Sequence, residues 1–181
     1  MRNIVLLILK EKGNIKLVDM PAIQARAYLL SRLIQRDYGF SYNYYCLWST
    51  KLYNTIVELN REGLIEMKLG SQKRTHYLLT ELGEKELEEY EEREMDFLRG
   101  KLNKIIIREV FQNRNHLHMM LIMDYIAQKI GGREDRLRLM YNLRALGWHP
   151  SPSAFNLAYN SLSRVNPPYK KEVPIVSRGK N

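Results

Sequence analysis

Residues 49–86 read STKLYNTIVELNREGLIEMKLGSQKRTHYLLTELGEKE. The first part of this stretch has apolar residues at helical spacing, at Leu52, Ile56, Leu59 and Leu64. Ser49 or Thr50 can cap the free amide groups at the start of such a helix, and Gly63 can end it. The pattern therefore predicts a helix that begins after a polar cap and stops just before Leu64.

A two-stranded hairpin is predicted directly after this helix. Apolar and polar residues alternate with strand period in two runs, at Ile65, Met67 and Leu69 and then at Thr75, Tyr77 and Leu79. Between them, Gly70 to Arg74 form a small polar turn whose only charges are positive. Thr80 then caps a further helix, with Glu81 and Glu84 in a first turn that favours acidic groups.

A helix followed at once by a basic-tipped hairpin is typical of nucleic-acid-binding proteins. A helix fits the DNA major groove, and a hairpin can reach the neighbouring backbone or minor groove. The runs LYNTIVELNREGLIEM and RTHYLLTELGEKEL resemble winged-helix transcription regulators of the PadR and MarR type. In that family the recognition helix ends in E-G-L-I, here Glu62–Ile65, and the wing runs into Y-x-L-T-x-x-G, here Tyr77–Gly83. The resemblance covers about residues 1–99.

The resemblance implies a mainly α fold with a small β-hairpin, in which a winged helix-turn-helix precedes an α-helical C-terminal region. We expect a winged-helix DNA-binding domain over residues 1–86 and a long linking or dimerisation helix over residues 87–112. A helical C-terminal region over residues 113–165 and a flexible tail over residues 166–181 complete the expected organisation. The family implies nothing for residues 112–181.

The charge of the chain is distributed in three blocks. Its 181 residues carry a formal charge of +9, and their 45% apolar content is enough for a packed core. Residues 1–79 hold 12 basic and 6 acidic residues, residues 80–99 hold 3 and 9, and residues 100–181 hold 14 and 5. Two basic blocks flanking an acidic helix favour a polyanionic partner such as DNA, RNA or anionic lipid, although many basic proteins carry only solvated surface charge.

Several classes of protein are not expected from this sequence. The single cysteine, Cys46, excludes an internal disulfide and a cysteine-based zinc site. The pair His116 and His118 lacks a further ligand, so no metal is expected. We find no phosphate-cradling glycine loop, no nucleophile elbow and no paired carboxylates, and we expect neither an enzyme nor a cofactor. No run approaches the ~20 apolar residues of a membrane span, so we expect a cytoplasmic protein without membrane contact.

The N-terminal part is expected to supply the first helix of a helix-turn-helix. Residues 4–9 predict a short buried helix, and Ile15, Leu17 and Met20 a brief strand. Asp19 as cap and Pro21 in the first turn then predict a helix that continues over residues 22–36. The following connection is rich in tyrosine.

The candidate DNA-binding residues are the polar side chains of the predicted recognition helix and wing. They are Ser49, Thr50, Lys51, Tyr53, Asn54, Lys68, Gln72, Lys73, Arg74 and His76. Asn54 has the donor and acceptor that adenine requires, and Lys51 could pair with guanine or phosphate. Further phosphate contacts are predicted for Arg26, Arg32, Arg36, Tyr44 and Tyr45, although the two tyrosines could equally pack between helices.

The acidic helix over residues 84–99 has two readings. Its apolar seam is formed by Leu82, Leu87, Tyr90, Met95, Leu98 and Leu102. It either packs on its own domain or, as the resemblance implies, forms part of a dimer helix over residues 84–111. We favour a homodimer through this helix and the C-terminal helices. Within the C-terminal region, a helix is predicted with inward-pointing side chains at Leu137, Leu139, Met140, Leu143 and Leu146. Ser153 is predicted to cap the last helix.

The sequence thus predicts sequence-specific binding of double-stranded DNA by a homodimeric transcriptional regulator. Its recognition helix would enter the major groove and its basic wing would lie on the backbone. Three alternatives stay open. The first is a plasmid or viral DNA-maintenance factor for replication or partition. The second is a winged-helix module that docks within an RNA-protein or protein complex. The third is a ligand sensor, which would need a pocket that the sequence does not reveal.

Overall fold

The chain is mainly α-helical with a small antiparallel sheet. A computed structural model describes residues 1–11, 18–43, 46–70, 74–90, 95–100, 114–130 and 135–165. The elements of its first part are α1 (Arg2–Lys10), β1 (Val18–Asp19), α2 (Met20–Leu33), β2 (Ser41–Asn43), β3 (Cys46–Trp48), α3 (Thr50–Arg61), β4 (Ile65–Leu69), β5 (Thr75–Leu79) and α4 (Glu81–Glu88). A helical turn over 95–100 follows, and then α6 (Arg114–Ile130), α7 (Arg136–Ala145) and α8 (Pro152–Val165).

The main sheet has three antiparallel strands in the order β1-β5-β4. Strands β4 and β5 form the predicted hairpin, with Ile65 opposite Leu79 and Leu69 opposite Thr75. Strand β1 adds only Val18 and Asp19, opposite Tyr77 and His76. The sheet thus joins two parts of the chain that lie on either side of α2 and α3 in the sequence.

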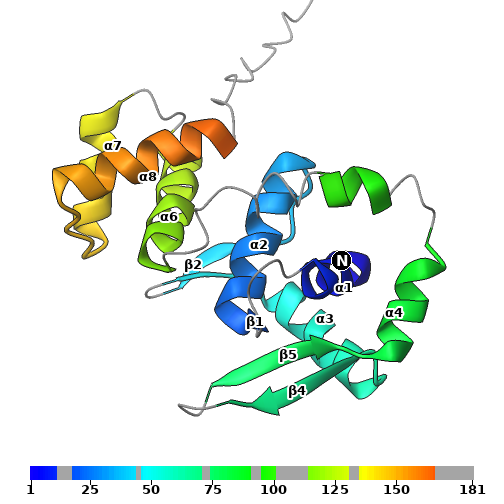
Figure 1. Cartoon of the computed structure of the whole chain (residues 1–181). Helices are drawn as coiled ribbons and strands as arrows, with labels where there is room; N and C mark the ends of the chain where they lie inside the picture. The colour runs from blue at the N-terminus through cyan, green and yellow to red at the C-terminus, as the bar shows by residue number, and fades with distance from the viewer. Residues whose placement is uncertain are drawn as a thin grey trace, which may run out of the picture.

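Helix α1 lies at the centre of the N-terminal part. It contacts α2, α3, α4 and β5, which enclose it in Figure 1. All of Ile4 to Leu9 are buried, as the run of apolar residues predicted. Because apolar residues occupy every side of this short helix, it can be covered all round by its neighbours.

The predicted caps are confirmed and fix where three helices begin. Asp19 Oδ1 accepts from the Ala22 N–H (3.0 Å), Ser49 Oγ from Leu52 (3.1 Å) and Thr80 Oγ1 from Gly83 (3.1 Å). Gly63 has φ +75°, a left-handed conformation that suits the residue after a helix end. Local polar chemistry therefore sets the start of α2, α3 and α4.

The connection between α2 and α3 contains a second hairpin that the sequence did not reveal. Ser41 pairs with Trp48 and Asn43 with Cys46, in strands of three residues each. The predicted first strand is contradicted at Met20 only. Met20 begins α2, β1 is Val18–Asp19, and Ile15 and Leu17 lie outside the described residues.

The predicted long helix over residues 84–99 is wrong. Helix α4 ends at Glu88, residues 89–90 turn, and a separate helical segment occupies 95–100. Leu87, Met95 and Leu98, which were expected on a dimer seam, are buried in the core of their own chain. The seam is therefore used, at least in part, for internal packing. The homodimer itself stays a prediction, and residues 101–112 of the expected helix lie outside the described ones.

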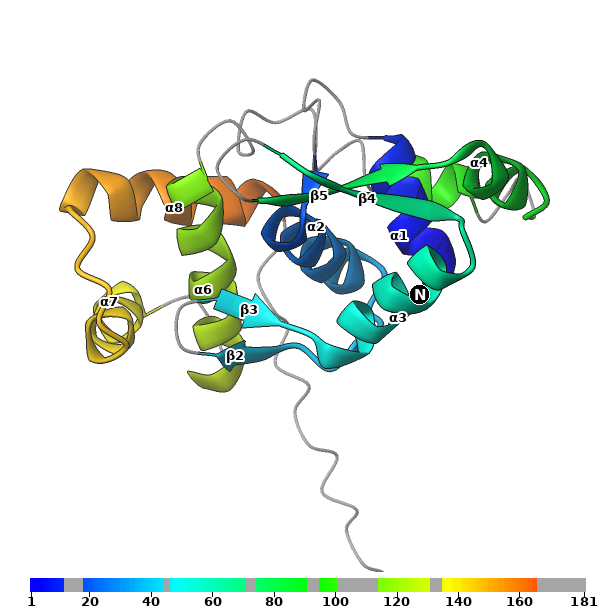
Figure 2. The same cartoon turned by 90° about the horizontal axis from the view of Figure 1, so that it is seen from below.

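The C-terminal helices pack around α6. Helices α7 and α8 both contact α6, and α6 in turn contacts α2 and β3. Figure 2 shows α6, α7 and α8 on one side of α2, with α1 and α3 on the other. The inward face of α7 was predicted only in part, because Leu139 and Leu143 are buried whereas Leu137 (84% exposed) and Leu146 point outward. Ser151, and not Ser153, accepts the hydrogen bond from the Ala154 N–H at the start of α8.

A buried polar cluster joins α2 to α6. The Asp124 carboxylate is fully buried and accepts from the Tyr28 hydroxyl (2.6 Å) and from Arg32 Nε (3.2 Å). Gln128 also donates to Asp124 Oδ2 (3.1 Å). Since buried polar groups require partners, this cluster fixes how the two helices meet. None of the described helices combines the length and apolar content that crossing a membrane would take.

Candidate nucleic-acid interface

Helix α3 divides into a buried face and an exposed face. Leu52, Thr55, Ile56 and Leu59 are buried. Seven of its 12 residues are exposed, and they are Thr50, Lys51, Tyr53, Asn54, Val57, Glu58 and Arg61. With a rise of about 1.5 Å per residue, the helix presents this polar strip over roughly three turns. That is a suitable length and width for one pass along a major groove.

Four of the five residues predicted on the recognition helix lie on this exposed face. Thr50, Lys51 and Asn54 are exposed, and Tyr53 is 42% exposed with its ring 5.6 Å from that of Trp48. The contact with Trp48 holds the Tyr53 ring against the molecule. Its hydroxyl can therefore be offered to a ligand at little further cost in conformational entropy.

Ser49 is the exception, and the prediction that it contacts DNA is wrong. It is fully buried, its Oγ caps α3, and its hydroxyl donates to the Tyr38 carbonyl. The residue that the sequence did not single out is Gln24 on α2. Its Oε1 accepts from the Ser49 N–H (3.0 Å) and its Nε2 donates to the Ser49 carbonyl (3.2 Å). Through this pair of bonds α2 holds the start of α3.

The hairpin β4–β5 carries the predicted wing residues in different settings. Arg74 is exposed, and its carbonyl accepts from the Gly70 N–H (2.8 Å) across the turn. Lys68 is exposed and pairs with Glu66 (3.2 Å), so the negative carboxylate weakens the attraction of Lys68 for an anionic ligand. His76 is half-buried beside Gly70. Gln72 and Lys73 lie outside the described residues.

Two of the arginines predicted to contact phosphates serve inside the fold. Arg26 is fully buried, its Nη1 donates to the Ile8 carbonyl (3.4 Å), and burial lowers its pKa. Arg32 is engaged with the buried Asp124, and its side chain is 21% exposed. The helical pattern placed both outside, but α1 and α6 cover those sides of α2. Arg36 is exposed, and its phosphate contact stays a prediction; Tyr44 and Tyr45 lie outside the described residues.

An ion pair removes negative charge from the end of α3. Arg2 on α1 contacts Glu62 (2.6 Å) and Glu86 (2.9 Å). The hydrogen bond from Arg2 lowers the pKa of Glu62 and raises that of Arg2. Arg2 thus offsets one of the two negative charges of Glu62, which directly follows α3, and Glu86.

No metal-binding group of three or more His, Cys, Asp or Glu residues exists in the part of the chain that the structure describes. His118, one of the two histidines considered above, stacks on Trp148 with 5.3 Å between ring centroids. Comparison with protein-family models, with curated proteins and with solved structures finds no match for this chain.

Proposed function

We propose that the chain is a winged-helix protein that binds double-stranded DNA with sequence preference, and that it acts as a transcriptional regulator and not as an enzyme. The order of elements supports the winged-helix reading. Helix α1, strand β1, helices α2 and α3 and the hairpin β4–β5 follow one another, and β1 pairs with the second hairpin strand. The hairpin β2–β3 is an insertion between the two helices of the helix-turn-helix.

The observation that carries the proposal is the exposed polar face of α3. Its inner face anchors the helix in the core, while Lys51, Tyr53 and Asn54 project from the outer face. Amide and ammonium groups of this kind read base edges and phosphates. The exposed Arg74 lies in the adjacent hairpin, where it would contact the backbone.

The homodimer belongs to the same proposal. A pair of identical α3 helices would bind two half-sites related by twofold symmetry, as many DNA-reading proteins of this size do. Because Leu87, Met95 and Leu98 are buried within the chain, we do not assign the contact between copies to them. A cytoplasmic location is part of the proposal as well.

The test is selection of bound duplexes from a random DNA pool at near-physiological salt, with an RNA pool selected in parallel. We expect enrichment of one duplex sequence, and for a homodimer that sequence is a palindrome. Lys51→Ala should weaken binding to the selected duplex. Arg144→Ala removes the same charge from an exposed site on α7 and is the matched control. Enrichment of RNA alone would contradict the proposal and favour a module of an RNA-protein complex.

A further inference from the structure

Strand β4 is an open edge of the three-stranded sheet. The order β1-β5-β4 leaves one side of β4 without a neighbouring strand among the described residues, as Figure 1 shows. All of its residues except Ile65 are exposed. An exposed edge strand can pair with a further strand through its free backbone groups. The edge of β4 is therefore a surface to which a partner can add a strand.

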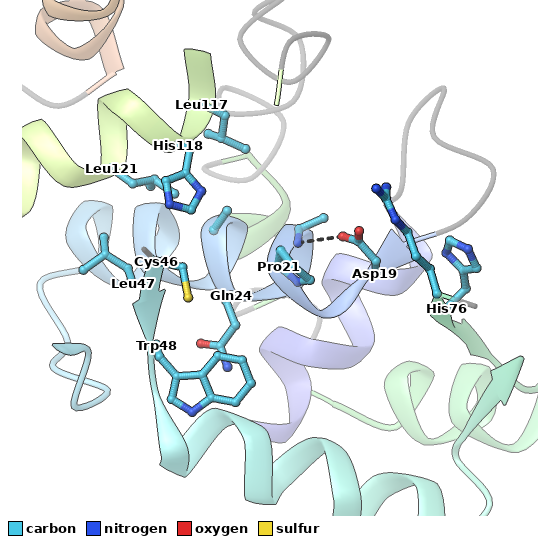
Figure 3. Close-up of a pocket in the computed structure, with 13 residues that line it drawn as sticks. Asp19, Pro21, Gln24, Cys46, Leu47, Trp48, His76, Leu117, His118 and Leu121 are labelled. Atoms are coloured by element: carbon cyan, nitrogen blue, oxygen red, sulfur yellow. Dashed lines mark hydrogen bonds between the residues drawn. The ribbon is translucent and has the colours of Figure 1, made fainter. Parts of the chain in front are cut away.

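A cavity borders β5 and not β4. It has a volume of about 310 Å³ and lies between the start of α2, strands β3 and β5 and helix α6. Figure 3 shows Trp48, His118 and Leu121 toward one side of it, with Asp19 and His76 on the other. None of the five described residues of β4 lines this cavity. The open edge of β4 is therefore a separate surface.

The hydrogen bonds of the hairpin show which backbone groups of β4 face its open edge. The Gly70 N–H donates to the Arg74 carbonyl (2.8 Å), and the Thr80 N–H donates to the Leu64 carbonyl (3.2 Å). Backbone groups of successive residues in a strand point to alternate sides, so the even-numbered residues of β4 bond to β5. The N–H and C=O groups of the odd-numbered residues therefore point to the open edge. These residues are Ile65, Met67 and Leu69.

Two large apolar side chains of β4 are exposed. Met67 is 50% exposed and Leu69 is 76% exposed. They share one face of the strand, because side chains alternate between the two faces. Covering such side chains with those of a second strand is favourable. The open edge thus carries apolar surface that a paired strand would bury.

The charges of β4 determine which strand fits this edge. Glu66 and Lys68 lie one position before and one position after Met67. If two copies of β4 pair antiparallel about a twofold axis at Met67, Glu66 of each copy lies directly opposite Lys68 of the other. A register centred on Glu66 or on Lys68 would put like charges opposite each other, which is unfavourable. The sequence of β4 is therefore complementary to itself in one register.

The same two residues already form an ion pair within one chain. Lys68 Nζ lies 3.2 Å from Glu66 Oε2, and both side chains are more than half exposed. An exposed ion pair of this kind contributes little to stability. Both side chains can therefore bond to a second copy at little cost to the fold.

We propose that two copies of this chain associate through their β4 strands, antiparallel and centred on Met67. The two three-stranded sheets then form one continuous sheet. Each copy uses the same surface, as a twofold interface requires. This contact rests on the homodimer of the proposed function and specifies where its two copies meet. Lys68, a candidate for DNA contact, then bonds to Glu66 of the second copy.

Charge reversal on β4 tests this contact in the full chain without nucleic acid. We would measure self-association by sedimentation velocity over a range of protein concentrations at low salt, and we expect a concentration-dependent dimer for the wild type. Glu66→Lys and Lys68→Glu each put like charges opposite each other at two places in the dimer. Each should weaken self-association by about 10-fold or more. Glu89→Lys makes the same charge change at an exposed position just after α4 and should dimerise like the wild type.

Mixing the two variants distinguishes a contact between copies from a change within one chain. In the mixed dimer, the Glu66→Lys chain presents two lysines to the two glutamates of the Lys68→Glu chain. The mixture should therefore associate about as strongly as the wild type, although neither variant does so alone. A wild-type chain that stays monomeric would overturn this contact and the homodimer, whereas duplex binding is tested by the selection experiment. A dimer that neither reversal weakens, or a mixture that does not associate, would overturn the β4 contact alone.

Discussion

Asn54 is the residue on α3 whose chemistry bears most on sequence preference. Its amide can both donate and accept, which is the pattern that adenine presents in the major groove. We predict that Asn54→Ala reduces the preference for the selected duplex over single-base variants by roughly 1–3 kcal/mol. Competition titrations with the variant duplexes measure this preference. Asn142→Ala, on α7, is the control and should leave it unchanged; equal loss in both variants would argue against base contact by Asn54.

Lys73 and Arg74 should act on affinity and not on preference. Charged groups on the backbone strengthen binding to every duplex by releasing counterions. We predict that the double variant Lys73→Ala with Arg74→Ala weakens binding to selected and random duplexes by similar factors. The plot of log affinity against log salt should become shallower, its negative slope shrinking in magnitude by about 1 for each phosphate that the variant no longer neutralises. An unchanged salt dependence would mean that Lys73 and Arg74 do not contact the DNA backbone.

Glu62 should make stability depend on acid pH. The hydrogen bond from Arg2 lowers its pKa, so the folded state favours the ionised carboxylate. The stabilisation is therefore present above the pKa of the unfolded chain and is lost as the pH falls through the lowered folded pKa. We predict that the Tm difference between wild type and Glu62→Gln is largest near neutral pH and shrinks as the pH falls through the lowered pKa of Glu62. Glu58→Gln, one turn earlier on α3, is the control, and a difference that persists in acid would contradict the role of the Arg2 pair.

At the scale of the element, Gly63 sets the end of α3 and the entry into β4. Its φ of +75° is a conformation that residues with a Cβ adopt at a cost. Nothing lies within 4 Å of where a Cβ would be, so the expected effect is backbone strain alone. We predict that Gly63→Ala lowers the free energy of unfolding by about 1 kcal/mol, and that Gly63→Asn costs less because asparagine tolerates this conformation. Chemical denaturation measures both; an equal loss would point to packing.

The elements that the sequence predicted best are those with a strong local signal. Caps at Asp19, Ser49 and Thr80 and the alternation in β4 and β5 arise from neighbouring residues, and the structure confirms them. The hairpin β2–β3 has strands of only three residues, too short for a period to show. The break after Glu88 was missed because the charged residues around it have a composition typical of a helix. The burial of Met95 and Leu98 depends on tertiary contacts, which a local pattern does not show.

The candidate site was predictable where it depends on one helix and not where it depends on contacts between distant segments. The spacing of Leu52, Ile56 and Leu59 was enough to place Lys51 and Asn54 on the opposite face. The burial of Arg26 and the pairing of Arg32 require α1 and α6, which the pattern of α2 does not describe. The cavity beside Trp48 needs four separate segments to form, so no local pattern could show it.

At the scale of the whole molecule, the cluster around Asp124 holds the two halves together. Removing its carboxylate leaves the Tyr28 hydroxyl and the Arg32 guanidinium without their shared acceptor. We predict that Asp124→Ala lowers the free energy of unfolding by about 3–5 kcal/mol and Tyr28→Phe by about 1–3 kcal/mol. Combining both changes should cost less than their sum, because they remove one shared interaction. Denaturant titration of the four chains tests this, and strict additivity would contradict a shared network.

The same cluster has a consequence for how the protein is made. Tyr28 and Asp124 are 96 positions apart in the chain, and a second bond, from Trp148 Nε1 to the Tyr42 hydroxyl (3.0 Å), spans 106. While only the N-terminal part has emerged from the ribosome, the Tyr28 hydroxyl on α2 therefore lacks the Asp124 carboxylate that accepts its hydrogen bond. Until α6 emerges, the face of α2 that α6 covers stays exposed, where it can bind chaperones or misassemble. The last third of the chain thus supplies hydrogen-bond partners that polar groups in the first third need.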